Sequence, residues 1–267
     1  MSEDVVDYIK LIDKDPTLCN NDLFKFYEKF NSKCENPSDE DYCKDNIVGV
    51  NESANDIFKK LMRNVYRLIK NSGTYYNTID SGNYSSKRCI YLKYWFYDKI
   101  LTENIDESSI SKLFNALSQN KENLTNNDIK CEFHEINLNE IKDMKKLYDY
   151  FVFYDGYKFV ENIIYDKIFN SVHHDYLKRA IDVHKNAESE CSKQDITGGY
   201  CNEYNNYIKK HINSSLLYSL EEKLKDEDIV TLIEKTIETK GTTSAQNVQG
   251  AQERGETSHT DKKQVKS

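Results

Sequence analysis

The chain has 267 residues, of which 31% are charged and 38% are hydrophobic, and its formal net charge is −8. This acidic balance argues against a protein that wraps nucleic acid, because neutralising phosphates requires clustered Lys and Arg. With 9 Gly and 2 Pro the chain has few turn residues for a β-rich fold, whereas 20 Tyr and 11 Phe supply apolar surface for an all-α domain.

Hydrophobic periodicity predicts helices along most of the chain. In chain order they are expected near residues 4–13, 21–33, 54–71, 86–103, 106–119, 138–171, 174–190, 201–211 and 214–237. Gly156 is expected to interrupt or kink the longest of them. The loops near 72–85 and 120–137 are polar and rich in Asn. The sequence therefore predicts an irregular multi-helix bundle.

The helix expected over residues 54–71 has a clear amphipathic pattern. Its apolar stripe comprises Ile57, Leu61, Val65, Leu68 and Ile69. Four polar residues are expected to face away from the core: Lys59, Lys60, Arg63 and Asn64. Asn51 or Ser53 is the expected N-cap, and Gly73 suits the left-handed position that ends a helix.

The composition changes near Lys240, where a segment rich in Thr, Ser, Gln and Gly begins. Such a segment buries too little apolar surface to offset its ordering entropy. We therefore expect one helical domain over residues 1–240 and a disordered, low-complexity tail or linker over 241–267. No stretch approaches the roughly 18 uninterrupted apolar residues of a transmembrane helix, so no membrane span is expected in this chain.

Seven cysteines lie in polar loops or at the ends of expected helices, at positions 19, 34, 43, 89, 131, 191 and 201. This placement favours disulfides formed in an oxidising compartment. The pairs Cys34 with Cys43 and Cys191 with Cys201 each close a short loop. Cys89 with Cys131 would then remain, and Cys19 would be the odd thiol. The alternative is that several cysteines are free, buried thiols.

Two groups of residues are candidates for a metal site or a catalytic site. Cys131 and His134 have the spacing of half a zinc site, but no matching second half follows. His174 with its neighbour His173, together with His184, is the candidate acid/base cluster, although surface or interfacial helix positions are the commoner role of such residues. No Ser elbow, phosphate loop or dinucleotide motif accompanies them. We therefore expect no catalytic residue, metal ligand or cofactor.

The segment Cys89–Asp98 is the most aromatic part of the chain and holds its single Trp. On a helix, Leu92, Trp95 and Phe96 form a wide apolar face together with Lys99. Such a face anchors a core, whereas an exposed Trp would instead suggest a hot spot for a partner. Packing in the core is the expected role.

This aromatic helix, CIYLKYWFYDKI, resembles the C-x-YL-x-YW-x-YD signature of the Vir proteins, the vivax members of the Plasmodium interspersed repeat (PIR) family. The signature residues are Cys89, Tyr91, Leu92, Tyr94, Trp95, Tyr97 and Asp98. The segments FYEKFN, LYDYFVFYDGY and CSKQDITGGYCNEYNNYI also resemble family segments in the same order, so that the likeness covers about residues 18–225. Met62 stands where a family Cys is expected, and Cys19 and Cys34 look additional.

The resemblance implies a mostly helical, disulfide-bridged variant antigen of a malaria parasite, which binds proteins and is not an enzyme. Family members are thought to be exported into or onto the infected red cell, with roles in immune evasion or adhesion. The implied partners are a host cell-surface or serum protein and antibodies. Many members continue into a transmembrane helix, and this chain is expected to lack that anchor. The alternative function is an intracellular scaffold with reduced cysteines.

Overall fold

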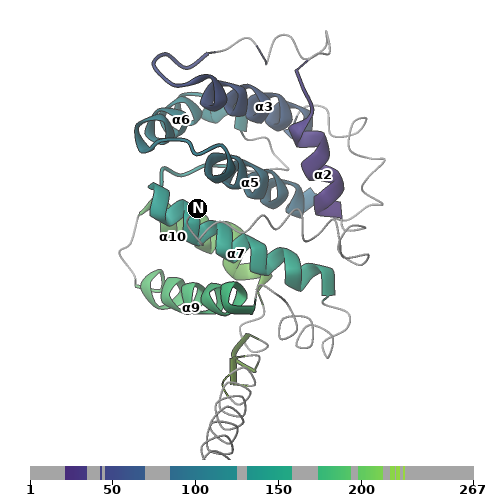
Figure 1. The fold of residues 1–267 in the computed structure, drawn as a ribbon, viewed down its shortest axis with the longest axis vertical. Coiled ribbons are helices and arrows are strands. Elements are labelled where there is room, and N and C mark those ends of the chain that lie inside the picture. The colour runs from purple at the N-terminus through teal and green to yellow at the C-terminus, as the bar shows by residue number, and fades with distance from the viewer. Residues whose placement is uncertain are drawn as a thin grey trace, which may run out of the picture. The chain divides into compact units, whose positions relative to one another are not determined.

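The computed structural model describes residues 22–34, 43, 46–69, 85–124, 131–157, 174–193, 198–212, 217–219, 221, 222 and 225 (Figure 1). The elements of these ranges are helical throughout: α2 (Asp22–Asn31), α3 (Glu52–Ile69), α5 (Ser85–Thr102), α6 (Glu107–Gln119), η2 (Lys121–Leu124), α7 (Leu138–Tyr157), α9 (His174–Glu190), α10 (Gly199–Glu203), η3 (Tyr204–Ile208) and η4 (Lys209–His211). The all-α fold expected from the sequence is confirmed.

Several expectations concern residues outside this description. They are the helix at 4–13, the loop at 72–84, the second half of the helix at 138–171, Cys19, and the tail at 241–267. The chain divides into two compact units, Met1–Leu217 and Tyr218–Ser267. The helices named above belong to the first unit. In the second unit, Lys225 forms an ion pair with Glu221 over 2.7 Å.

Local sequence determines where the helices begin. Asn51 caps α3, since its side-chain oxygen accepts a hydrogen bond of 2.8 Å from the Ala54 amide. Asp106 caps α6 in the same way by accepting from the amide of Ser109. Asn137 accepts from the Glu140 amide at the start of α7, and the Glu140 carboxylate accepts from the Asn137 amide in return. These contacts satisfy amides that a helix leaves without partners at its first turn.

Helix α5 is the centre of the described bundle. It contacts α2, α3 and α7 and lies between α3 and α7 in Figure 1. Every side chain from Arg88 to Asp98 is buried, so the helix is enclosed on all sides and not only on the apolar face expected from the pattern. Its signature residues are accordingly core residues, as expected for Trp95.

Aromatic rings join α5 to its neighbours. The rings of Trp95 and Phe30 have centroids 6.3 Å apart and meet edge to face. Phe96 meets Phe114 of α6 at 5.9 Å and Phe133 at 5.2 Å, again edge to face. Such pairs add to the stabilisation from burial because the positive edge of one ring faces the negative face of the other.

One prediction for α3 was wrong. Arg63 and Asn64 do not face solvent; both are fully buried. The guanidinium of Arg63 donates to the carbonyl oxygens of Phe30 and Ser32, over 3.0 and 2.7 Å, and the Asn64 amide also donates to Phe30 over 2.9 Å. These carbonyls belong to the end of α2, where a helix leaves acceptors unpaired, and a cation there also complements the helix dipole.

Three disulfides join the cysteines that the loop argument had paired: Cys34 with Cys43, Cys89 with Cys131, and Cys191 with Cys201. The four cysteines of the last two bridges lie in a loop or near helix ends, as expected, and all four are buried. The second bridge ties α5 to the segment before α7, and the third ties the end of α9 to α10. Because the sulfur of Cys131 is bonded to Cys89, it is not available as half of a zinc site.

None of the described helices combines the length and the apolar character that crossing a membrane requires.

We expect Trp95→Ala to lower the free energy of unfolding by about 3–5 kcal/mol, because it removes a large, fully buried side chain and leaves a cavity. Val48→Ala is the control, since Val48 is 91% exposed and its truncation should change stability by less than about 0.5 kcal/mol. Urea unfolding followed by circular dichroism measures both. Equal stability of the two variants would contradict the core role of Trp95.

Candidate functional site

The segment 131–137 between η2 and α7 has no regular secondary structure, and the hydrogen bonds of Glu132 and His134 alternate as in an extended chain and come from one side. Its first residue, Cys131, is bonded to Cys89 of α5. The amide of Glu132 donates to the Tyr207 hydroxyl over 2.9 Å, and its carbonyl accepts from the ammonium of Lys93. The amide of His134 donates to a carboxylate oxygen of Glu203 over 2.9 Å. Side chains of α5, α10 and η3 therefore bind the backbone of this segment where a sheet would use a neighbouring strand.

Lys93 and Glu203 form an ion pair that is completely buried. The Lys93 ammonium lies 2.8 and 2.9 Å from the two carboxylate oxygens, and both side chains have zero exposure. The ammonium also lies 4.1 Å from the ring centroids of Phe133 and Tyr207. Burial lowers the pKa of Lys93, and the charge of Glu203 opposes this shift. Removal of either charge would leave the other without compensation in a site that water does not reach.

A second buried network joins α2, α5 and α7. The Lys145 ammonium lies 2.6 Å from Asp149 and 3.3 Å from Asp98. The hydroxyl of Tyr27 donates to Asp98 over 2.5 Å, and that of Tyr94 donates to Asp149 over 3.0 Å. Burial lowers the pKa of Lys145, but the charges of the two aspartates outweigh burial. The pKa of Lys145 therefore lies above its ordinary value. Two signature residues, Tyr94 and Asp98, thus serve to compensate a buried charge.

Each of the two buried ammonium groups is paired with carboxylates, and none of these paired residues lines either of the two pockets found among the described residues. His184 is fully buried, with its Nδ1 3.2 Å from the Tyr204 hydroxyl, so the expected surface or interfacial position was wrong. Burial lowers the pKa of His184, which keeps the ring neutral at pH 7. Within the described ranges no group of acidic, His and Cys side chains could hold a metal ion.

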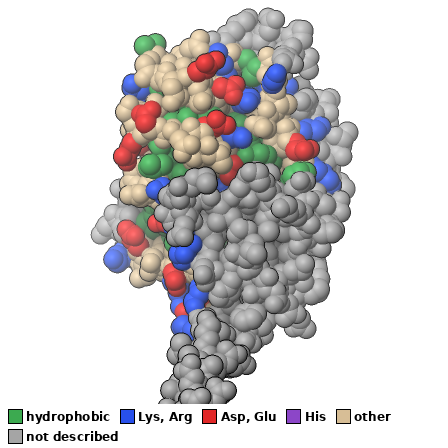
Figure 2. All heavy atoms as spheres, in the orientation of Figure 1, with side chains coloured by type: hydrophobic (Ala, Val, Ile, Leu, Met, Phe, Trp, Pro, Cys, Tyr) green, Lys and Arg blue, Asp and Glu red, His purple; other side chains and the backbone are tan. Residues whose placement is uncertain are grey.

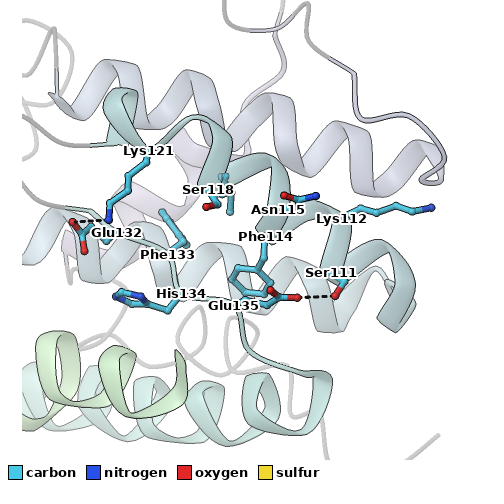
Figure 3. A pocket seen from close by; sticks show the side chains of 11 residues that line it. Ser111, Lys112, Phe114, Asn115, Ser118, Lys121, Glu132, Phe133, His134 and Glu135 are labelled. Atoms are coloured by element: carbon cyan, nitrogen blue, oxygen red, sulfur yellow. Dashed lines mark hydrogen bonds and ion pairs between the residues drawn. The ribbon is translucent and has the colours of Figure 1, made fainter. Parts of the chain in front are cut away.

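A groove of about 480 Å³ opens between α6 and the extended segment (Figure 3). Phe114 and Leu117, both buried, belong to the apolar part of its lining on α6. The exposed wall of α6 carries a polar row: Ser111, Asn115 and Ser118. The opposite wall is formed by four consecutive residues: Glu132, Phe133, His134 and Glu135. The volume lies within the usual range of ligand sites, roughly 300–1,000 Å³.

Two polar contacts cross the groove, one near each end (Figure 3). The Lys121 ammonium lies 3.8 Å from a carboxylate oxygen of Glu132. At the other end, the Ser111 hydroxyl donates to the Glu135 carboxylate over 2.8 Å. Both contacts involve solvent-exposed side chains, so each contributes little to stability and can be exchanged for contacts with a ligand.

Gly199 fixes how closely α10 approaches this segment. A Cβ atom at Gly199 would overlap the carbonyl oxygen of Glu135. The glycine begins α10 and lets this helix pack against the segment backbone. Close approach of α10 in turn brings Glu203 within reach of Lys93.

Sequence reasoning did not single out the groove. It named residues 120–137 as a polar loop and the signature residues as core, and the residues of the two walls come from parts of the chain that no motif connects. The spacing of Ser111, Asn115 and Ser118 along one helix face was the available signal, but a polar stripe is also what any solvated helix shows. Figure 2 shows acidic and basic side chains interspersed over the described residues of its face.

Comparison with known proteins identifies the family. The family model described as Plasmodium vivax Vir protein matches residues 21–267, which is nearly the whole chain. Neither the curated proteins nor the solved structures yield a match.

We expect Glu203→Gln to lower the free energy of unfolding by about 3–5 kcal/mol, because it leaves the buried Lys93 charge without its carboxylate. Glutamine keeps an oxygen that can accept from the His134 amide. The control is Asp143→Asn, which removes a partly exposed ion pair with Lys146 and should cost less than about 1 kcal/mol. Urea unfolding at neutral pH compares them. Equal losses would contradict a structural role for the buried pair.

Stability should fall as the pH rises above about 10. Burial raises the pKa of Tyr94, Tyr97 and Tyr148 well above the ordinary value, and the charges of Asp149 or Glu203 raise it further. Tyrosines of the unfolded chain ionise near pH 10. The stability that the buried, neutral tyrosines contribute is therefore complete below pH 10, and it is lost as the pH rises towards their pKa values in the folded protein. Urea unfolding at a series of pH values, with tyrosinate absorbance, tests this. Ionisation of every tyrosine near pH 10 with the helices intact would contradict it.

Proposed function

Because the chain belongs to the Plasmodium vivax Vir protein family, we propose that it is a variant antigen that acts by equilibrium binding to a host protein. The family is one of variant surface antigens of malaria parasites. The specific proposals are export to the infected red cell or its surface, a host cell-surface or serum protein as partner, recognition by antibodies, and a role in immune evasion or adhesion. No enzymatic turnover and no cofactor are part of this function.

The observation that carries the proposal is the groove between α6 and the segment 131–135. An anchor side chain of a partner gains most from a preformed pocket with an apolar floor and a polar rim. Phe114 and Leu117 supply apolar lining, and the row from Ser111 to Ser118 supplies rim groups. The walls are held by a disulfide and a buried ion pair, so binding would not have to order them first.

The separation of stabilising groups in the core from variable positions on the surface also supports an antigenic role. The buried charges, aromatic rings and disulfides stabilise the scaffold, whereas Asn115, Ser118 and Lys121 are exposed. Substitutions at exposed positions usually change stability by less than about 0.5 kcal/mol. A surface of this kind tolerates sequence variation while the fold is retained, which is what a diversified antigen requires.

The alternative, an intracellular scaffold with reduced cysteines, receives less support. Six cysteines stand in three bonded pairs, and structural disulfides persist in oxidising surroundings. Counting thiols with and without reductant, on protein from infected cells, separates the two functions. Seven free thiols in the native protein would favour the scaffold, because the chain has seven cysteines and three intact bridges would leave a single thiol.

We expect a host partner to be found by screening the folded full chain against ectodomains of red-cell and immune-cell receptors and against serum proteins. Asn115→Arg should then weaken binding at least about tenfold, because it places a long charged side chain over the groove. Surface plasmon resonance measures the affinity. The matched control is Gln119→Arg, which adds the same charge to an exposed position of the same helix outside the groove lining.

Both variants should fold as the parent chain does, since both positions are exposed. If Asn115→Arg binds a confirmed partner as tightly as Gln119→Arg does, recognition takes place on another surface. If no host protein binds the folded chain, the proposed function is wrong.

A further inference from the structure

One hydrogen-bonding edge of the segment 131–135 is occupied, and the other, the open edge, makes no hydrogen bond with the described part of the chain. The amide and carbonyl of Glu132 and the amide of His134 bind Tyr207, Lys93 and Glu203. A trans peptide unit points its carbonyl opposite to the amide of the next residue. The Phe133 carbonyl therefore points away from Glu203, and the Phe133 amide points away from Lys93.

Phe133 thus presents both backbone groups on the open edge. Among the described residues neither its amide nor its carbonyl makes a hydrogen bond. A residue with this arrangement is half of the doubly bonded pair that two antiparallel strands form. The residue as a whole is only 8% exposed and its ring packs on Phe96, so the backbone cannot turn to find another partner without loss of core packing.

The open edge faces the groove. In Figure 3 the segment faces the α6 side chains across the groove, whereas the occupied edge is the one bound by Glu203 of α10. Successive side chains of an extended segment point to opposite faces, yet four consecutive residues, 132–135, line this groove. A groove that is lined by every residue of an extended stretch must run along the backbone of that stretch. The groove therefore adjoins the backbone of residues 132–135.

We propose that the groove takes an extended peptide segment of the partner protein, which adds to the segment 131–135 as an antiparallel strand and exchanges two hydrogen bonds with Phe133. This inference rests on the proposed function and specifies the chemistry of the partner. Four residues of an extended chain span about 10 Å, so three or four residues of the peptide occupy the groove.

The groove also determines which side chains fit. One apolar side chain lies over Phe114 and Leu117, and its neighbours contact the polar row of α6 or solvent. The rim carries two lysines and two glutamates, Lys112, Lys121, Glu132 and Glu135, and so has no net charge. A neutral peptide backbone complements such a rim, whereas a polyanion such as a nucleic acid or an acidic membrane does not.

The test uses the full chain with its disulfides intact and a phage library of random linear heptapeptides as the probe. Peptides are selected on the parent chain and retained only if Asn115→Arg abolishes their binding while Gln119→Arg does not. Each retained peptide is then made with a methyl group on one backbone nitrogen at a time. We expect methylation at alternate positions to weaken binding about tenfold and methylation at the intervening positions to change it less than about twofold.

Hydrogen exchange measured by nuclear magnetic resonance supplies the second readout. In the free protein the amides of Glu132 and His134 should exchange slowly and that of Phe133 rapidly. Peptide binding should slow exchange at Phe133. Methylation effects at every third or fourth position would mean a helical ligand and overturn the proposal, as would rapid exchange at Phe133 in the complex.

Other occupants have distinct signatures. Slow exchange at Phe133 in the free chain that does not depend on protein concentration would mean that a segment of this chain occupies the edge. Slow exchange that increases with protein concentration would mean that a second copy occupies it. Either result overturns the proposal. A host protein whose binding Asn115→Arg abolishes while Phe133 stays unprotected leaves the proposed function intact and refutes the added strand. Peptides that protect Phe133 without any host protein that binds would refute the proposed function alone.

Discussion

The buried ion pair of Lys93 and Glu203 is the interaction on which the groove side of the structure depends. An ammonium without exposure is tolerable only if several groups compensate it. Here the carboxylate of Glu203, the carbonyl of Glu132 and two aromatic rings do so, and they come from α10, the extended segment and η3. The charge therefore fixes three separate parts of the chain around α5, and the Cys89–Cys131 bridge holds the same segment covalently.

This arrangement has a consequence for recognition. An extended segment in a helical protein has no neighbouring strand, and its backbone groups need other partners. Side chains of the core satisfy one edge, and among the described residues the backbone groups of Phe133 on the second edge make no hydrogen bond. Rigid backbone beside exposed, tolerant side chains suits a variant antigen, because main-chain hydrogen bonds do not depend on which side chains vary.

The Lys145 network gives the signature its physical meaning. Tyr94 and Asp98 compensate the ammonium of Lys145 together with Asp149, which lies in the Asp- and Tyr-rich segment of α7. The two segments resemble the same family at a distance of about fifty residues in sequence. Both segments stabilise the buried ammonium of Lys145 between α5 and α7. Because these residues are buried, a partner protein cannot contact them.

The sequence by itself determined the features that depend on neighbouring residues: the periodic helices, the start of α3 at Asn51 or Ser53, the cysteine pairs that close short loops, and the family. Only the tertiary structure decided the burial of Arg63, Asn64, Lys93 and His184, because a polar residue in a helical pattern is assigned to solvent unless a distant partner is known. The groove, too, depends on contacts between residues that are distant in sequence. Its walls meet because α10, which begins at Gly199, approaches the backbone of Glu135 and carries Glu203 to Lys93, more than a hundred residues away in sequence; no local pattern encodes such a contact.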